Sequence, residues 1–223
     1  MNNIHISRVN RTKEEAKANY NKISKWYDLL TGLSEKKYRD AGIQKLDIQE
    51  GENVLEIGFG TGNCILNLAK SAGKSGRVYG IDISENMVDI TCLKVKKAGL
   101  SETVILKCSD ASVLPFEACM LDAVFISFTL ELFDTPEIPI LLNECKRVLK
   151  KGGRICIVAM SKKTNSGLMI TLYEWFHTKF PVLVDCRPIL LQKELEETGF
   201  QVNNASDHFI WGLPVEIVLA KKD

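Results

Sequence analysis

The feature that most constrains this fold is a glycine-rich turn directly after a short apolar segment. Residues 54–57 (Val-Leu-Glu-Ile) form an apolar run with one acidic member, Glu56, and Gly58, Gly60 and Gly62 follow at alternate positions. A helical pattern begins immediately after the last glycine. This order predicts a buried strand, a tight turn and a helix start, in which backbone approaches a ligand where a side chain would clash.

A second strand pattern completes a nucleoside-binding unit. Residues 78–81 are mostly apolar and lead into Asp82, roughly twenty residues beyond the glycine turn. A carboxylate at the carboxyl end of such a strand accepts hydrogen bonds from both hydroxyls of a ribose. The two segments together therefore predict a βαβ unit that binds a nucleoside.

The spacing of the turn separates two classes of nucleoside cofactor. Dinucleotide-binding folds use G-x-G-x-x-G, whose third glycine lets the helix pack closely while its N-terminus holds a pyrophosphate. Here Asn63 occupies the place of that third glycine, and Glu56 lies just before the turn. A carboxylate repels a pyrophosphate and attracts an amino group and a sulfonium. The pattern favours S-adenosylmethionine over NAD, with an ordinary turn whose glycines serve packing alone as the alternative.

Composition limits the partners and the compartment. A formal net charge of +1 gives no general attraction to nucleic acid. No apolar segment approaches the ~18 residues of a membrane-spanning helix, and the N-terminus lacks the apolar core of a signal peptide. The seven cysteines form no C-x-x-C pair, which indicates reduced thiols and no structural metal site. We expect a cytoplasmic protein with no metal, no nucleic-acid partner and no stable membrane insertion, and leave a homodimer open.

The rest of the chain alternates strand and helix patterns. These patterns predict an α/β fold, a doubly wound, mostly parallel sheet of about seven strands that ends in an antiparallel hairpin. The predicted strands are a first strand ending at residue 57, then 77–82, 103–108, 121–127, 154–159, 201–210 and 215–221. The predicted helices are 12–30 (ended by Gly32), 34–46, 61–72, 84–99, 136–149, 167–180 and 189–198. We expect a helical cap over 1–46, a cofactor-binding domain over 47–223, and an inserted helical lid at 163–190.

Several further segments carry a resemblance to a known family. They are Lys-Trp-Tyr-Asp at 25–28, Asp-Ala at 110–111 leading to Leu-Pro-Phe at 114–116, Ile-Ser-Phe at 126–128, and 147–154. With these segments the chain resembles the class I S-adenosylmethionine-dependent methyltransferases, which are Rossmann-like. Within that superfamily it is most similar to the C-methyltransferases of ubiquinone and menaquinone biosynthesis (methyltransferase type 11 domain).

The resemblance implies which residues hold the methionine end of the cofactor. The turn formed by Gly58, Gly60 and Gly62 would surround that end, together with Thr61. Glu56 would lie near the amino group, through water or backbone.

The resemblance also implies the contacts of the adenosine. Asp82 would take the ribose hydroxyls, and Ile83 and Met87 would pack on the adenine. Asp110 would accept a hydrogen bond from the adenine amino group, and Ala111 would supply a backbone donor. The alternative role of Asp110 is only to cap a turn.

On the acceptor side, Ser127 would sit near the reactive methyl group. Tyr20 and Tyr27 share one face of the first predicted helix, either as a lid over the pocket or as core aromatics. Methyl transfer from a sulfonium is an in-line displacement, for which the enzyme aligns the nucleophile and excludes water. The chemistry needs neither a metal nor a catalytic triad.

One position departs from the resemblance. The quinone enzymes typically carry an Arg-Asn pair shortly after Ile-Ser-Phe, and Glu131 and Leu132 stand there in this chain. A glutamate favours an amine-bearing acceptor or serves as a general base. Glu131 is the first candidate for a general base, and His177 is the second.

These observations predict S-adenosylmethionine-dependent methyl transfer to a small hydrophobic acceptor of quinone or phenol type. One alternative is N-methylation of an amine or a lipid head group. Others are a nicotinamide-dependent oxidoreductase, and a non-catalytic S-adenosylmethionine sensor that keeps Asp82. The absence of a Tyr-x-x-x-Lys pair and the presence of Asn63 argue against the oxidoreductase.

Overall fold

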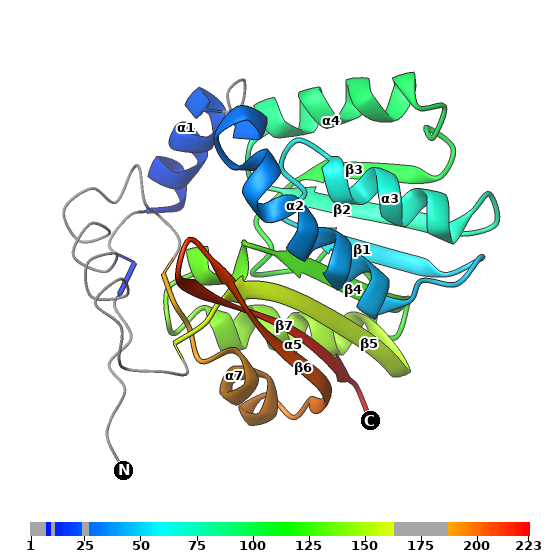
Figure 1. The fold of residues 1–223 in the computed structure, drawn as a ribbon. Coiled ribbons are helices and arrows are strands. Elements are labelled where there is room, and N and C mark those ends of the chain that lie inside the picture. The colour runs from blue at the N-terminus through cyan, green and yellow to red at the C-terminus, as the bar shows by residue number, and fades with distance from the viewer. Residues whose placement is uncertain (1–7, 10–11, 24–26, 163–186) are drawn as a thin grey trace, which may run out of the picture.

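A seven-stranded sheet with the order β3-β2-β1-β4-β5-β7-β6 forms the centre of the molecule (Figure 1). The computed structural model describes residues 8–9, 12–23, 27–162 and 187–223. The strands are β1 (Asn53–Ile57), β2 (Arg77–Asp82), β3 (Val104–Cys108), β4 (Leu121–Ser127), β5 (Leu149–Met160), β6 (Gln201–Ile210) and β7 (Leu213–Lys221). Neighbouring strands from β3 to β5 pair in parallel, whereas β7 is antiparallel to both β5 and β6. The predicted doubly wound, mostly parallel sheet with a terminal hairpin is confirmed.

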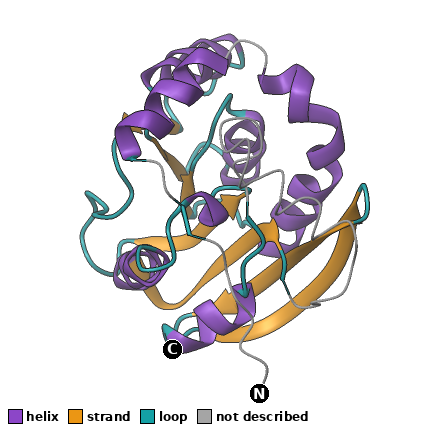
Figure 2. Ribbon diagram, turned by 90° about the vertical axis from the view of Figure 1, so that its left-hand side faces the viewer, coloured by secondary structure: helices purple, strands orange, loops and turns teal. Residues whose placement is uncertain are grey.

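Helices cover both faces of this sheet (Figures 1 and 2). They are α1 (Lys13–Ile23), α2 (Tyr27–Leu46), α3 (Asn63–Ala72), α4 (Glu85–Lys97), α5 (Ile138–Val148) and α7 (Leu191–Glu197), with the 3₁₀ helix η1 at Leu130–Leu132. Side chains of α2, α3 and α4 share one apolar cluster, and those of α5 and α7 share the other. The sheet therefore separates two cores, as in other doubly wound folds.

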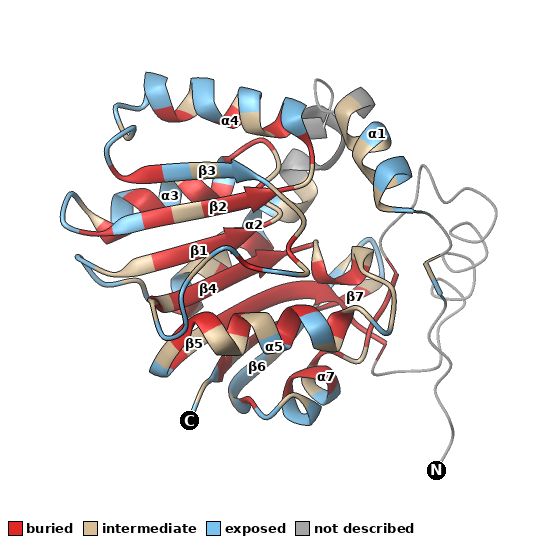
Figure 3. Ribbon diagram, turned by 180° about the vertical axis from the view of Figure 1, so that it is seen from behind, coloured by how far each residue is buried: buried red, intermediate tan, exposed pale blue. Residues whose placement is uncertain are grey.

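Burial on both faces explains the apolar central strands (Figure 3). Every residue of β4 except Asp122 is buried, and Leu55, Phe125 and Ile157 are each 0% exposed. Parallel strands covered on both sides are expected to be nearly continuously hydrophobic. This property made β4 predictable to the residue, because the strand has the predicted bounds of 121–127. The predicted bounds of β2 and β6 are also confirmed.

Two predicted boundaries are wrong. Gly32 does not end a helix but lies inside α2, because one helical glycine costs only about 1 kcal/mol and α2 packs along β4, β5 and β7. At Gly42 this packing is so close that a Cβ atom would lie 2.6 Å from Cγ2 of Val158. Gly152 and Gly153 do not form a turn before the fifth strand but lie within β5, in an irregularity where the register with β4 shifts.

The cap, the lid and one helix were also predicted. The helix at 167–180 and most of the lid at 163–190 lie outside the described residues. The domain boundary at residue 46 stays a prediction, and α2, which belongs to the predicted cap, packs on the sheet. No described helix is long and apolar enough to cross a membrane.

The buried aromatic at the centre of β4 provides a test of this packing. Phe125→Ala is expected to lower the free energy of unfolding by about 3–5 kcal/mol, because it leaves a cavity between α2 and the sheet. The same change at Phe209, which is 65% exposed, is expected to cost no more than about 0.5 kcal/mol. Urea unfolding of both variants measures the difference. Similar losses would contradict the assigned core.

Candidate functional site

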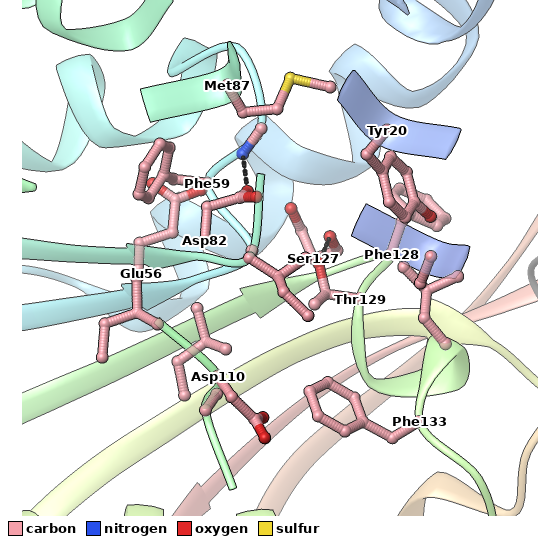
Figure 4. A pocket seen from close by; sticks show the side chains of 18 of the residues that line it. Tyr20, Glu56, Phe59, Asp82, Met87, Asp110, Ser127, Phe128, Thr129 and Phe133 are labelled. Carbon is pink, nitrogen blue, oxygen red and sulfur yellow. Dashed lines mark hydrogen bonds between the residues drawn. The ribbon is translucent and has the colours of Figure 1, made fainter. Parts of the chain in front are cut away.

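A pocket opens at the carboxyl ends of β1, β2 and β4 (Figure 4). The strand order reverses between β1 and β4, and ligands of doubly wound sheets bind outside the strand ends at such a point. The pocket brings together most of the predicted cofactor residues: Glu56, Gly58, Gly60, Thr61, Asp82, Ile83, Met87, Asp110, Ala111 and Ser127. Segments that follow β1, β2, β4 and also β3, which precedes Asp110 and Ala111, thus meet in one pocket.

The three glycines of the turn have different structural roles, although all have positive φ. A Cβ at Gly58 would lie 2.3 Å from Oγ1 of Thr129, and one at Gly62 would lie 2.5 Å from Cγ2 of Thr91. A Cβ at Gly60 would meet nothing within 4 Å. Gly58 and Gly62 are therefore needed for packing, with Gly62 behind the turn as the N-cap of α3. Gly60 alone leaves space beside the pocket that a ligand can fill.

Asp82 is held in place by backbone donors. Its Oδ2 accepts a hydrogen bond from the amide of Gly60 at 2.9 Å, and its Oδ1 accepts one from the amide of Ser84 at 2.9 Å. Burial raises the pKa of Asp82, while these amides act to lower it. A carboxylate has about four acceptor positions, so these amides leave acceptor capacity for a hydroxyl group of a ligand. Ser84 also accepts from the amide of Met87, which confirms the predicted helix cap.

Glu56 is a buried carboxyl group at the base of the pocket. Burial raises its pKa to about 8; the charge of Asp82 adds to this, while Arg39 and Cys64 oppose it. Its Oε2 has no hydrogen-bond partner among the residues that the structure describes. Buried polar atoms are normally paired, so this oxygen indicates a missing donor. The amino group of S-adenosylmethionine fits that requirement.

Asp110 has a partner that the sequence did not indicate. Lys13 of α1 donates to Oδ2 of Asp110 at 2.6 Å, and its Nζ lies 3.2 Å from Oε1 of Glu137. Burial acts to raise the pKa of Asp110, but Lys13 and Ser112 lower it below the usual value. The ion pair attaches α1 across the pocket. The role of Asp110 as an acceptor for adenine stays a prediction.

Aromatic side chains form the other side of the pocket (Figure 4). Tyr20 lines it from α1, and Phe128 and Phe133 line it from the segment after β4. Phe128 has φ of 49°, a strained conformation for a bulky residue and one that is concentrated at functional sites. Ser127, at the end of β4, also lines the pocket. The side chain of Tyr27 lies outside the described residues.

The two predicted general bases are not brought into this pocket by the described residues. Glu131 lies in η1, is 0% exposed, and accepts a hydrogen bond from the amide of Met160 at 3.2 Å. It is not among the lining residues. His177 lies outside the described part of the chain. The described residues also contain no cluster of side chains suited to a metal ion.

Sequence reasoning missed Glu35 and Arg39, which line the pocket from α2. Arg39 donates to Glu35 at 2.9 Å, and both side chains are largely buried. Their spacing of four residues is common on exposed helices, so it gave no signal of a site.

The space beside Gly60 provides the first test of the pocket. Gly60→Ala is expected to weaken S-adenosylhomocysteine binding by at least roughly tenfold, because the methyl group enters space beside the ligand. Gly152→Ala is the matched control: Gly152 also has positive φ, and a Cβ there meets nothing within 4 Å. Both variants bear the same backbone cost of about 1 kcal/mol. Calorimetry measures the affinities, and equal affinities would contradict this role of Gly60.

The raised pKa of Glu56 predicts a pH dependence of stability. Between its ordinary pKa of 4.5 and the folded value of about 8, the folded protein keeps a proton that the unfolded chain has lost. The free energy of unfolding of the ligand-free protein therefore falls as pH rises, by at most about 1.4 kcal/mol per pH unit from this group. Glu56→Gln should remove that contribution, measured by urea unfolding across the window. Identical slopes in both proteins would contradict the assignment.

Comparison with known proteins agrees with this geometry. A demethylmenaquinone methyltransferase of Bacillus subtilis (strain 168) is 33% identical to the chain over 166 residues, 73% of this chain and 70% of that protein. One of Geobacillus kaustophilus (strain HTA426) is 30% identical over 200 residues, 90% of this chain and 81% of that protein.

Solved structures show the same fold. An S-adenosylmethionine-dependent methyltransferase from Aquifex aeolicus is similar with a TM-score of 0.63 at 24% identity, covering 83% of this chain and 89% of that one. The [4+2]-cyclase SpnF is similar with a TM-score of 0.78 at 19% identity, covering 97% and 98%. At the level of sequence, the model of the ubiE/COQ5 methyltransferase family matches residues 7–208. The chain belongs to this family and is an S-adenosylmethionine-dependent methyltransferase.

Proposed function

We propose that this enzyme transfers a methyl group from S-adenosylmethionine to the ring of a hydrophobic, quinol-type acceptor. The observation that carries the proposal is a single pocket with two chemically different sides. One side holds the glycine turn with Phe59, Glu56 and Asp82, and the other holds Tyr20, Phe128 and Phe133 (Figure 4). The names of the relatives from Bacillus subtilis and Geobacillus kaustophilus, both demethylmenaquinone methyltransferases, support an acceptor of this class.

The residues present suit both reactants. S-adenosylmethionine, when bound, supplies a methyl group on a positively charged sulfur. Asp82 and the turn at Gly60 would fix the direction of that methyl group by holding the ribose and the methionine chain. Phe128 and Phe133 would orient a flat ring and exclude water from the reacting atoms, which is most of what the displacement requires.

The position of Glu131 bears on the alternative acceptor. An amine-bearing substrate was an option because Glu131 stands where the quinone enzymes carry an arginine. Glu131 is buried, accepts a hydrogen bond from the amide of Met160, and is not among the described residues that line the pocket, so the described lining does not support a contact with such an amine. This favours the quinol-type acceptor. Glu131 and His177 stay proposals as general bases.

We also propose a cytoplasmic enzyme that acts on a small molecule without nucleic acid, in agreement with the net charge of +1. Sedimentation at several protein concentrations measures the oligomeric state and distinguishes a monomer from a homodimer.

Ligand binding tests the cofactor first. S-adenosylhomocysteine is expected to bind the wild-type protein in calorimetry, whereas NADH is not. Asp82→Ala should weaken the binding at least roughly 100-fold, because it removes the ribose acceptor and frees the amides of Gly60 and Ser84. Asp122→Ala is the matched control, since Asp122 also accepts a backbone hydrogen bond, from Asn53, but at the opposite ends of the strands. Binding of NADH alone would overturn the assignment.

The acceptor is tested next. A reduced demethylmenaquinone analogue with a short side chain is expected to gain one methyl group, detected by mass spectrometry, while simple amines are not. Methylation of the amine alone would overturn the quinol-type acceptor and leave the cofactor assignment intact.

A further inference from the structure

The hairpin formed by β6 and β7 exposes two aromatic side chains at its tip. Among the described residues, the exposed large hydrophobic side chains include two aromatic ones, Trp211 at 75% and Phe209 at 65%. Apolar side chains scattered singly over a surface need no explanation, but these two stand only two positions apart at one turn. The tip is therefore a candidate contact surface.

The backbone of the turn indicates that the tryptophan does not serve the fold. Pairing of β6 with β7 continues to Ile210 and Leu213, which leaves Trp211 and Gly212 as a two-residue loop. Their φ angles are 49° and 82°, as in the type I′ turn, whose first position favours Asn, Asp or Gly. A bulky residue in this conformation is strained, and such strain is concentrated at functional sites. The turn keeps an exposed tryptophan where an asparagine would suit the backbone better.

The turn lies at the end of the sheet at which the pocket opens. β5 is parallel to β4, and Met160 at its carboxyl end pairs with Val215 near the start of β7. The turn before β7 therefore projects beyond the carboxyl ends of the parallel strands, on the same side as α1 in Figure 1. The acceptor proposed for the pocket is hydrophobic, and such a molecule partitions from water into a lipid bilayer. Contact between this end of the molecule and a bilayer would bring the pocket to its acceptor.

A cation lies next to the aromatic tip. The carbonyl of Phe209 accepts a hydrogen bond from the hydroxyl of Tyr38 on α2. The ammonium of Lys37, an exposed residue, lies 4.6 Å from the centre of the Tyr38 ring. Aromatic rings suit the head-group level of a bilayer, and lysines are attracted to anionic lipids. The exposed Asp207 lies two residues farther from the turn than Phe209, about 7 Å back along β6, so the contact is confined to the tip.

We propose that the tip of the β6–β7 hairpin docks this enzyme on the surface of an anionic phospholipid bilayer. Trp211 and Phe209 enter the head-group region, and Lys37 faces the lipid phosphates. Such contact is reversible, and its strength depends on the buried apolar area and on the charge of the lipids. The purpose of docking rests on the proposed function, because the bilayer supplies a hydrophobic acceptor, but binding to vesicles tests the surface without any acceptor.

Vesicle co-sedimentation tests the docking surface. The wild type is expected to bind vesicles of mixed phosphatidylglycerol and phosphatidylcholine at least roughly fivefold more tightly than vesicles of phosphatidylcholine alone. Trp211→Asn is expected to weaken binding to the mixed vesicles at least roughly tenfold, because it removes most of the apolar area that enters the bilayer. The same variant should be at least as stable as the wild type in urea, since asparagine suits the turn.

Leu93→Asn is the matched control. Leu93 is 70% exposed on α4, which packs on β2 and β3 at the opposite edge of the sheet from β6. This variant should keep the vesicle affinity of the wild type. Equal affinities of the wild type and Trp211→Asn, or a wild type that binds neither kind of vesicle, would overturn the proposal. Lower stability of Trp211→Asn would show that the tryptophan serves the fold and would overturn it as well. A wild-type dimer that Trp211→Asn converts to a monomer would assign the tip to a second copy of the chain instead.

Methylation assays separate this proposal from the proposed function. With a short-chain, water-soluble quinol, Trp211→Asn should be as active as the wild type. With a long-chain quinol in the mixed vesicles, it should be at least roughly fivefold slower, because it binds less to the surface that holds the acceptor. Vesicle binding that depends on Trp211 without methylation of either quinol would overturn the quinol-type acceptor and support the docking surface.

Discussion

The carboxylate of Asp82 joins the three segments on which the pocket depends. One oxygen accepts from Gly60 in the turn after β1, the other from Ser84 at the start of α4, and Asp82 itself ends β2. Burial makes these bonds strong, because few water molecules compete for the donors. The glycine turn, the end of β2 and the first turn of α4 therefore keep one relative arrangement.

Around this fixed centre, charge is distributed in two separate groups. Glu56 and Arg39 line one part of the pocket, and Lys13 pairs with Asp110 and Glu137 in another. The first group is formed by elements packed into the sheet. The second depends on α1, which crosses the pocket and bonds to it through side chains. The pocket thus combines a part built on the sheet with a part in which α1 is held by ion pairs and hydrogen bonds of its side chains.

The comparison with solved structures shows what the fold alone does not decide. The cyclase SpnF is similar over nearly the whole chain, yet its name describes a different reaction from methyl transfer. A shared sheet provides the position of a site, and the side chains around it determine the chemistry. Here that chemistry is supported by the buried carboxyl of Glu56, the space at Gly60 and the aromatic side formed by Phe128 and Phe133.

The sequence by itself determined the features that depend on neighbouring residues. The strands, the glycine turn, Asp82 and the cap at Ser84 follow from short patterns, because buried strands leave apolar runs, tight turns leave glycines and helix caps leave hydroxyl residues in the local sequence. Only the tertiary structure decided which distant residues meet. Lys13 reaches Asp110 across 97 positions, Arg39 on α2 lines the same pocket as Glu56 on β1, and Glu131 accepts a hydrogen bond from the amide of Met160. Those contacts depend on how helices dock on the sheet, which local periodicity does not encode.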